Sequence, residues 1–177
     1  MDYLTMKWKY WYTYLDVNKD GKISMEDVEE CRKKFTDLHK LAGEKAKNVN
    51  VDIEQWWNTY IFRAGAGKEI SVDDFVSILS ADYKKDKAGF KDSMQKCFEK
   101  VFDVIDMDKD RTIDLDEFVF AFRAFGHENE AVLKSVFDSY GQKKVPMKKL
   151  VDSWVQFVCD EDKSKKDVLL EAFKKGM

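Results

Sequence analysis

The stretch DVNKDGKISMED, from Asp16 to Asp27, recurs later in the chain as DMDKDRTIDLDE, from Asp106 to Glu117. Both twelve-residue stretches carry side-chain oxygens at positions 1, 3, 5, 9 and 12 and an isoleucine at position 8. Apolar residues spaced three and four apart precede and follow each stretch, which is typical of amphipathic helices. The sequence therefore predicts two helix-loop-helix units, each with a loop that gathers oxygen atoms around one point.

This spacing is that of an EF-hand, whose loop surrounds a Ca²⁺ ion with roughly six to eight oxygens. We expect each loop to bind one calcium ion through positions 1, 3, 5, 7, 9 and 12, with position 7 acting through its backbone carbonyl. In the first loop these ligands are Asp16, Asn18, Asp20, Lys22, Ser24 (through a water) and Asp27. In the later loop they are Asp106, Asp108, Asp110, Thr112, Asp114 and Glu117.

Two residues depart from the usual EF-hand pattern. Asp27 closes the first loop where glutamate is usual, and because it is one methylene shorter we expect it to bind with one oxygen and to let Mg²⁺ compete. Arg111 stands at position 6, where the first loop has Gly21. A positive φ at a non-glycine residue costs about 1 kcal/mol. We expect the five carboxylates of this loop to outweigh that cost, because a divalent ion relieves their mutual repulsion.

Two further helix-loop-helix units follow the clear ones. Their loops are RAGAGKEISVDD, residues 63–74, and DSYGQKKVPMKK, residues 138–149, and both have lost most ligand positions. We expect these second and fourth loops to bind no metal and to pair with the first and third. The pairing would run through the aliphatic residues at position 8, which are Ile23, Ile70, Ile113 and Val145.

The predicted fold is therefore all-α, with four EF-hand units in two paired lobes that form a compact globule. We expect the N-terminal pair to span residues 1–82 and the C-terminal pair residues 83–177. Ser164 and Asp167 resemble a capping box. They predict a short C-terminal helix over residues 165–175, whose apolar stripe must be buried against the rest of the protein.

Composition narrows the functional classes. The formal net charge of −3 and the pI of about 5.5 give no sign of nucleic-acid binding. No apolar run approaches the roughly 20 residues that span a bilayer, and there is no signal peptide, so we expect a cytosolic protein. The three cysteines lack CxxC spacing and are expected to be reduced. No catalytic constellation accompanies His39 or His127, for which we expect surface or capping roles, and no enzyme is predicted.

Three stretches resemble a known family: DYLTMKWKYWYTYLDVNKDGKIS, VDIEQWWNTYIF and FDVIDMDKDRTIDLDEFVFAFRAFGHENE. They are similar to the sarcoplasmic calcium-binding proteins of invertebrate muscle, especially the molluscan, scallop-type members, and the resemblance covers essentially the whole chain. It implies two lobes packed face to face, a location in the sarcoplasm, and Ca²⁺/Mg²⁺ buffering. The residues that match the family's first site are Asp16, Asn18, Asp20, Lys22 and Asp27, and those that match its third are Asp106, Asp108, Asp110, Thr112 and Glu117.

A buffer only binds and releases its ion, whereas a sensor exposes a groove that is usually rich in methionine. Here the apolar positions are mostly Phe, Trp, Val and Leu, and the seven Met are scattered. This favours a high-affinity Ca²⁺/Mg²⁺ buffer, monomeric and without an obligatory protein target. The alternatives are a calexcitin-like sensor with a protein target and a small-molecule, luciferin-type binding protein, in which Trp-rich helices would line a cavity.

Overall fold

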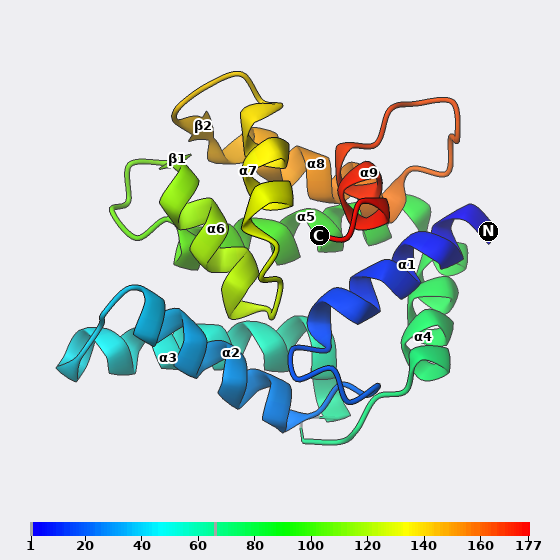
Figure 1. The fold of residues 1–177 in the computed structure, drawn as a ribbon. Helices are drawn as coiled ribbons and strands as arrows, with labels where there is room; N and C mark the ends of the chain where they lie inside the picture. The colour runs from blue at the N-terminus through cyan, green and yellow to red at the C-terminus, as the bar shows by residue number, and fades with distance from the viewer. Residues whose placement is uncertain (1, 66) are drawn as a thin grey trace.

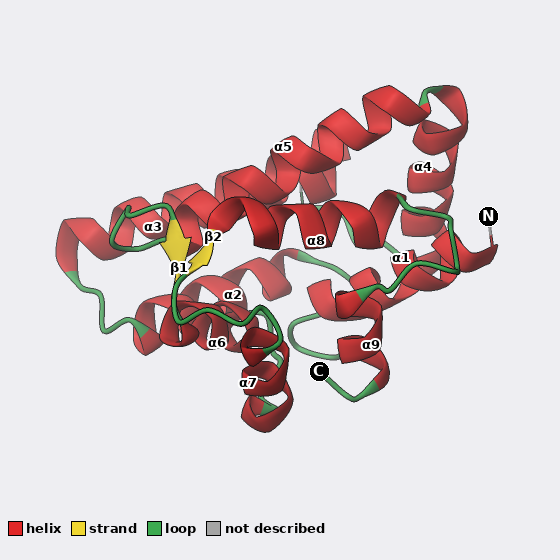
Figure 2. Ribbon diagram, turned by 90° about the horizontal axis from the view of Figure 1, so that it is seen from above, coloured by secondary structure: helices red, strands yellow, loops and turns green. Residues whose placement is uncertain are grey.

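The structure, a computed structural model, describes residues 2–65 and 67–177. Within these residues the chain is mostly helical, and its two short strands belong to the loops (Figures 1 and 2). The first two units contain α1 (Asp2–Leu15), α2 (Met25–Leu38), α3 (Gly43–Trp56) and α4 (Val72–Lys85). The last two contain α5 (Lys87–Ile105), β1 (Thr112–Ile113), α6 (Leu115–Ala124), α7 (Glu130–Asp138), β2 (Val145–Pro146) and α8 (Met147–Cys159), and α9 (Val168–Lys174) follows them.

The loops pair as the sequence predicts. Ile23 and Ile70 form an antiparallel bridge, with N–O distances of 3.2 and 2.8 Å. Ile113 pairs with Val145 between β1 and β2, and all four side chains are buried. Each acidic loop is thus fixed along one edge by its neighbour, and the β1–β2 pair lies near one end of α5 and α8 in Figure 2.

One aromatic core joins the two halves of the chain. The Trp11 and Phe98 rings lie 5.5 Å apart, and the Tyr14 and Phe122 rings lie 5.6 Å apart. Trp56 reaches Phe125 at 5.9 Å. Aromatic side chains bury large apolar areas and lock through edge-to-face and stacked contacts. The N-terminal and C-terminal halves of the chain therefore share a single packed interior.

The segment around Trp56 to Phe62 is helical, as predicted, but it changes type. A π-helix spans Trp57–Phe62, and a short 3₁₀ turn, Arg63–Gly65, follows it. The wider turn leaves Trp57 fully buried next to Trp56. Both tryptophans are thus core residues.

The C-terminal helix begins later than predicted. α9 starts at Val168 rather than 165, because Asp167 is its N-cap and accepts a hydrogen bond from Leu170 N at 3.0 Å. Ser164 instead donates its hydroxyl to Asp162 Oδ1 at 2.6 Å. The apolar stripe of α9 is buried as expected, and the Phe173 and Phe157 rings stack at 5.2 Å.

A buried lysine ties this C-terminal segment to α1. Lys7 is 1 % exposed, and its Nζ lies 2.6 Å from the Asp160 carbonyl oxygen and 3.1 Å from Asp167 Oδ2. Because an uncompensated charge is costly in the interior, this pair holds α1 and the start of α9 together. Figure 1 shows α9 beside α1.

The two histidines occupy different environments. His39 is the C-cap residue of α2, in line with the predicted capping role. The predicted surface position of His127 is wrong: its side chain is buried, and its ring stacks on Tyr14 at 4.7 Å. Its Nδ1 lies 3.1 Å from the Met177 backbone oxygen, and burial lowers its pKa.

Across residues 2–65 and 67–177, no helix combines the length and apolarity that a membrane span needs.

Candidate metal centres

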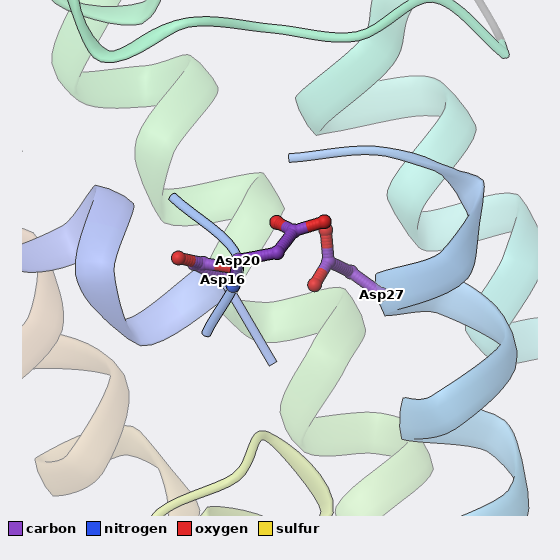
Figure 3. A group of neighbouring side chains, drawn as sticks. All are labelled: Asp16, Asp20 and Asp27. Atoms are coloured by element: carbon purple, nitrogen blue, oxygen red, sulfur yellow. The ribbon is translucent and has the colours of Figure 1, made fainter. Parts of the chain in front are cut away.

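The first loop brings three carboxylates together. Oxygens of Asp16, Asp20 and Asp27 lie within 4.8 Å of one another. Asp27 belongs to the first turn of α2, and Figure 3 shows its carboxylate facing that of Asp20. Asp16 and Asp27 are buried, whereas Asp20 is exposed. The loop therefore folds its acidic positions inward around one centre.

Backbone N–H groups of the loop hold these carboxylates in place. Asp16 Oδ2 accepts from Gly21 N at 2.9 Å. Asp27 accepts from Asn18 N at 3.1 Å and from Ser24 N at 2.8 Å. Ser24 is the N-cap of α2 and Asp27 is its N3 residue, and together they form a capping box. The start of α2 thus fixes the residue that closes the loop.

The third loop also brings three carboxylates together, and its closing residue is longer. Oxygens of Asp106, Asp108 and Glu117 lie within 4.8 Å of one another. Glu117 Oε2 accepts from Met107 N at 2.9 Å, and its Oε1 accepts from Asp114 N at 3.2 Å. Asp114 and Glu117 form the capping box of α6. The same helix-start device therefore positions both loop-closing carboxylates.

Position 6 requires a left-handed backbone in both loops. Gly21 has φ +87°, which costs glycine little. Arg111 has φ +65°, so the strain expected from the sequence is present. Its guanidinium lies 2.9 Å from Asp103 Oδ1, outside the ligand group. The third loop therefore closes at a backbone cost that the first loop avoids.

The carboxylates are held close together against their own repulsion. Burial, together with the charges of Asp16 and Asp20, raises the pKa of Asp27 to about 6, although hydrogen bonds from Ser24 and Asn18 oppose the shift. Burial also raises the pKa of Asp106 and Glu117. In addition, Asp106 Oδ1 is buried without a hydrogen-bond partner in the described structure. A buried, unpaired oxygen among like charges fits a divalent cation, and the all-oxygen donor set suits Ca²⁺ or Mg²⁺.

The remaining expected ligands surround these groups. The Ser24 and Asp114 side chains at position 9 accept from the helix backbone, from Glu26 N at 3.3 Å and Glu117 N at 2.9 Å. The Asn18 amide donates to Asp20 Oδ2 at 3.3 Å. Lys22 and Thr112 at position 7 donate their N–H groups to the position-5 aspartates of their own loops. These contacts fix the conformation of the two loops, and the assignment of these residues as metal ligands stays a prediction.

Asp110 differs from its counterpart Asp20, because it lies outside the group of converging carboxylates in its loop. Its Oδ2 lies 2.8 Å from the Nζ atom of Lys144, a residue of the fourth loop. This contact lowers the pKa of Asp110 and raises that of Lys144. Nothing in the sequence points to Lys144, because only the pairing of the loops brings position 7 of the fourth loop against position 5 of the third.

The comparisons with known proteins identify the family. No family model matches the chain. A sarcoplasmic calcium-binding protein from Mizuhopecten yessoensis is 55 % identical over 175 residues, covering 97 % of this chain and 98 % of the relative. The chain belongs to the sarcoplasmic calcium-binding protein family. Members of this family are calcium-binding proteins and not enzymes, in agreement with the sequence prediction.

Solved structures share the fold of this chain. The calcium-loaded apo form of the coelenterazine-binding protein from Renilla muelleri superimposes with a TM-score of 0.78 at 23 % identity, covering 97 % of this chain and 94 % of that one. A sarcoplasmic calcium-binding protein from amphioxus superimposes with a TM-score of 0.63 at 16 % identity, covering 97 % and 96 %. At these identities the likeness shows the EF-hand fold alone.

Proposed function

We propose that this member of the family is a sarcoplasmic Ca²⁺/Mg²⁺ buffer with two high-affinity sites, in the first and third loops. The convergence of three carboxylates in each of these loops, two of them buried, with Asp106 Oδ1 left unpaired, is the observation that carries the proposal. The residues that would hold the ions are Asp16, Asn18, Asp20, Lys22, Ser24 and Asp27 in the first loop, and Asp106, Asp108, Asp110, Thr112, Asp114 and Glu117 in the third. Bound calcium would neutralise the negative charge of these carboxylates.

The first site should accept Mg²⁺ more readily than the third. Asp27 and Glu117 make equivalent capping contacts, but Asp27 reaches Asn18 N at position 3 whereas Glu117 reaches Met107 N at position 2. Because Asp27 is one methylene shorter than Glu117, it should reach less far toward the centre of its loop. A smaller, six-coordinate ion tolerates a single carboxylate oxygen at this position better than Ca²⁺ does.

Packing favours a buffer over a sensor. A sensor must open a hydrophobic groove when it binds its ion. Here the apolar faces of both halves share one interior, and α9 covers part of it with the buried Leu169 and Phe173. Among the described residues, Val51 and Ile78 are the large hydrophobic side chains with substantial exposure. We infer a monomer that has no obligatory protein target and whose ligands are ions.

The luciferin-type alternative has less support. An apolar cavity of about 20 Å³ lies among Trp11, Tyr14, Trp56 and Trp154. That is room for about one water molecule, whereas sites for organic ligands measure roughly 300–1,000 Å³. Binding a chromophore would require the aromatic core to move apart.

Calorimetric titration of calcium, with and without millimolar Mg²⁺, tests the proposal when it is combined with a dye that reports exposed hydrophobic surface. We expect two sites that Mg²⁺ weakens, the first more than the third, and unchanged dye fluorescence on calcium binding. Two sites indifferent to Mg²⁺, with fluorescence rising as they fill, would instead establish a sensor. An absorbing organic compound that co-purifies with the protein would establish the ligand carrier.

A further inference from the structure

The fourth loop places a cation on a ligand position of the third loop. Lys144 Nζ lies 2.8 Å from Asp110 Oδ2. The other oxygen, Asp110 Oδ1, accepts from the Thr112 N–H at 2.9 Å and from the Thr112 hydroxyl at 2.8 Å. Donors of the protein itself therefore occupy both oxygens of the position-5 carboxylate.

The first loop provides an internal comparison. In the second loop the position equivalent to Lys144 is Glu69, an anion, and its Oε1 lies 2.5 Å from the Nζ atom of Lys22 in the first loop. That lysine is thus engaged by an anion of the partner loop, and Asp20 stays within 4.8 Å of two other carboxylates. In the third loop the partner supplies a cation, and Asp110 is missing from the corresponding group. The second loop thus presents an anion to the first loop, whereas the fourth loop presents a cation to the third.

We propose that Lys144 is a built-in competitor for the metal at the third loop, and that it sets the affinity of this site by holding Asp110 out of the ligand group. The inference rests on the proposed function, in which the third loop binds calcium. Recruiting Asp110 as a ligand means breaking its ion pair with Lys144 or sharing the carboxylate with it. Either way, a positive charge next to the site opposes a divalent cation.

The solvent exposure of the Lys144 and Asp110 side chains limits how much their ion pair can change the calcium affinity. The Lys144 side chain is 60 % exposed and that of Asp110 is 33 % exposed, so water and salt screen their attraction. Exposed pairs of this kind correspond to changes of about two- to fivefold in an equilibrium constant. The effect should shrink at high ionic strength, because the Debye length falls from about 10 Å at 0.1 M to about 3 Å at 1 M.

The test compares Lys144→Gln with Lys143→Gln. Both variants remove one positive charge from the same exposed segment of the fourth loop. Calcium affinity is measured by calorimetry at low and high salt, and thermal stability is measured both in chelator and in calcium. We expect Lys144→Gln to raise the affinity of the third site about two- to fivefold at low salt. We also expect Lys144→Gln to lower the melting temperature in chelator, because the substitution removes the ion pair with Asp110. The difference in melting temperature between the calcium-loaded and the chelated protein should therefore become larger.

A further variant, Glu117→Gln, tests metal binding by the third loop separately from the role of Lys144. Glu117→Gln should remove or strongly weaken one of the two sites, and if it leaves both intact, the proposed function is wrong for the third loop. If it does weaken one site but Lys144→Gln matches Lys143→Gln in affinity and in the stability gap, only the role of Lys144 is overturned. A loss of affinity in Lys144→Gln would likewise overturn it, because the lysine would then be organising the loop and not competing for it.

Discussion

Gly126, in the turn between α6 and α7, lies against the first metal loop. A Cβ atom built on Gly126 would lie 2.7 Å from the backbone oxygen of Val17, which occupies position 2 of that loop. Gly126 also has φ +90°. Gly126→Ala should therefore strain its own backbone and push on the first loop.

Two effects should lower the free energy of unfolding of Gly126→Ala. A side chain at this φ costs about 1–2 kcal/mol. The overlap with a backbone oxygen adds about 1–3 kcal/mol, because neither partner is a flexible side-chain end. Alanine recovers about 0.5–1 kcal/mol by restricting the unfolded chain. We expect a net loss of about 2–4 kcal/mol in the free energy of unfolding.

Gly141→Ala is the matched control, because Gly141 has φ +71° and a Cβ there would meet no atom within 4 Å. Gly141→Ala should strain only its own backbone and lower the free energy of unfolding by a net of about 0.5–1 kcal/mol. Urea unfolding in chelator measures both variants, and calorimetry then measures calcium binding. Gly126→Ala should also weaken the first site and leave the third unchanged. Equal destabilisation in the two variants, with both sites intact, would refute the contact between Gly126 and the loop.

Three further predictions concern the closing residue of the first loop and the lysine buried beside α9. Asp27→Glu should shift the first site toward Ca²⁺ over Mg²⁺ by about tenfold, since one more ligand oxygen reaches the ion, and competition calorimetry checks this. In chelator, the free energy of unfolding should fall as pH rises from about 4 to about 6, because folded Asp27 has a pKa of about 6 against 3.8 and so binds more protons than the unfolded chain there. Asp27→Asn should flatten that slope in urea unfolding, and an unchanged slope would contradict the assignment. Lys7→Met should cost about 3–5 kcal/mol in urea unfolding by stranding the buried Asp167 carboxylate, whereas Lys9→Met on the exposed face of α1 should cost little.

The loops were predictable because their chemistry is local. Ligand spacing, the position-8 aliphatic residues and the flanking periodicity all lie within short stretches of sequence. They sufficed for the loop pairing and for the group formed by Asp16, Asp20 and Asp27. The capping boxes at Ser24 and Asp114 place the closing carboxylates through the same twelve residues, which is why this geometry also follows the spacing.

Residues whose role depends on distant partners were not predictable in the same way. Lys7 falls on the apolar stripe of α1, between Leu4 and Trp11, and that position was the available signal of its burial. Its partners near Asp160 and Asp167 lie far along the chain, and periodicity does not reveal them. His127 likewise meets Tyr14 only in the folded protein. The division into residues 1–82 and 83–177 stays a prediction.

The most direct test of two-site calcium binding is stoichiometry measured by calorimetry on the wild type, Asp27→Asn, Glu117→Gln and the double variant, each checked for helical content. We predict two calcium ions per chain in the wild type and one tight site in each single variant, Asp27→Asn losing the first loop and Glu117→Gln the third. The double variant should retain no tight site. Tight binding that persists in the double variant, or a wild type that binds one ion or none, would contradict the assignment of these loops.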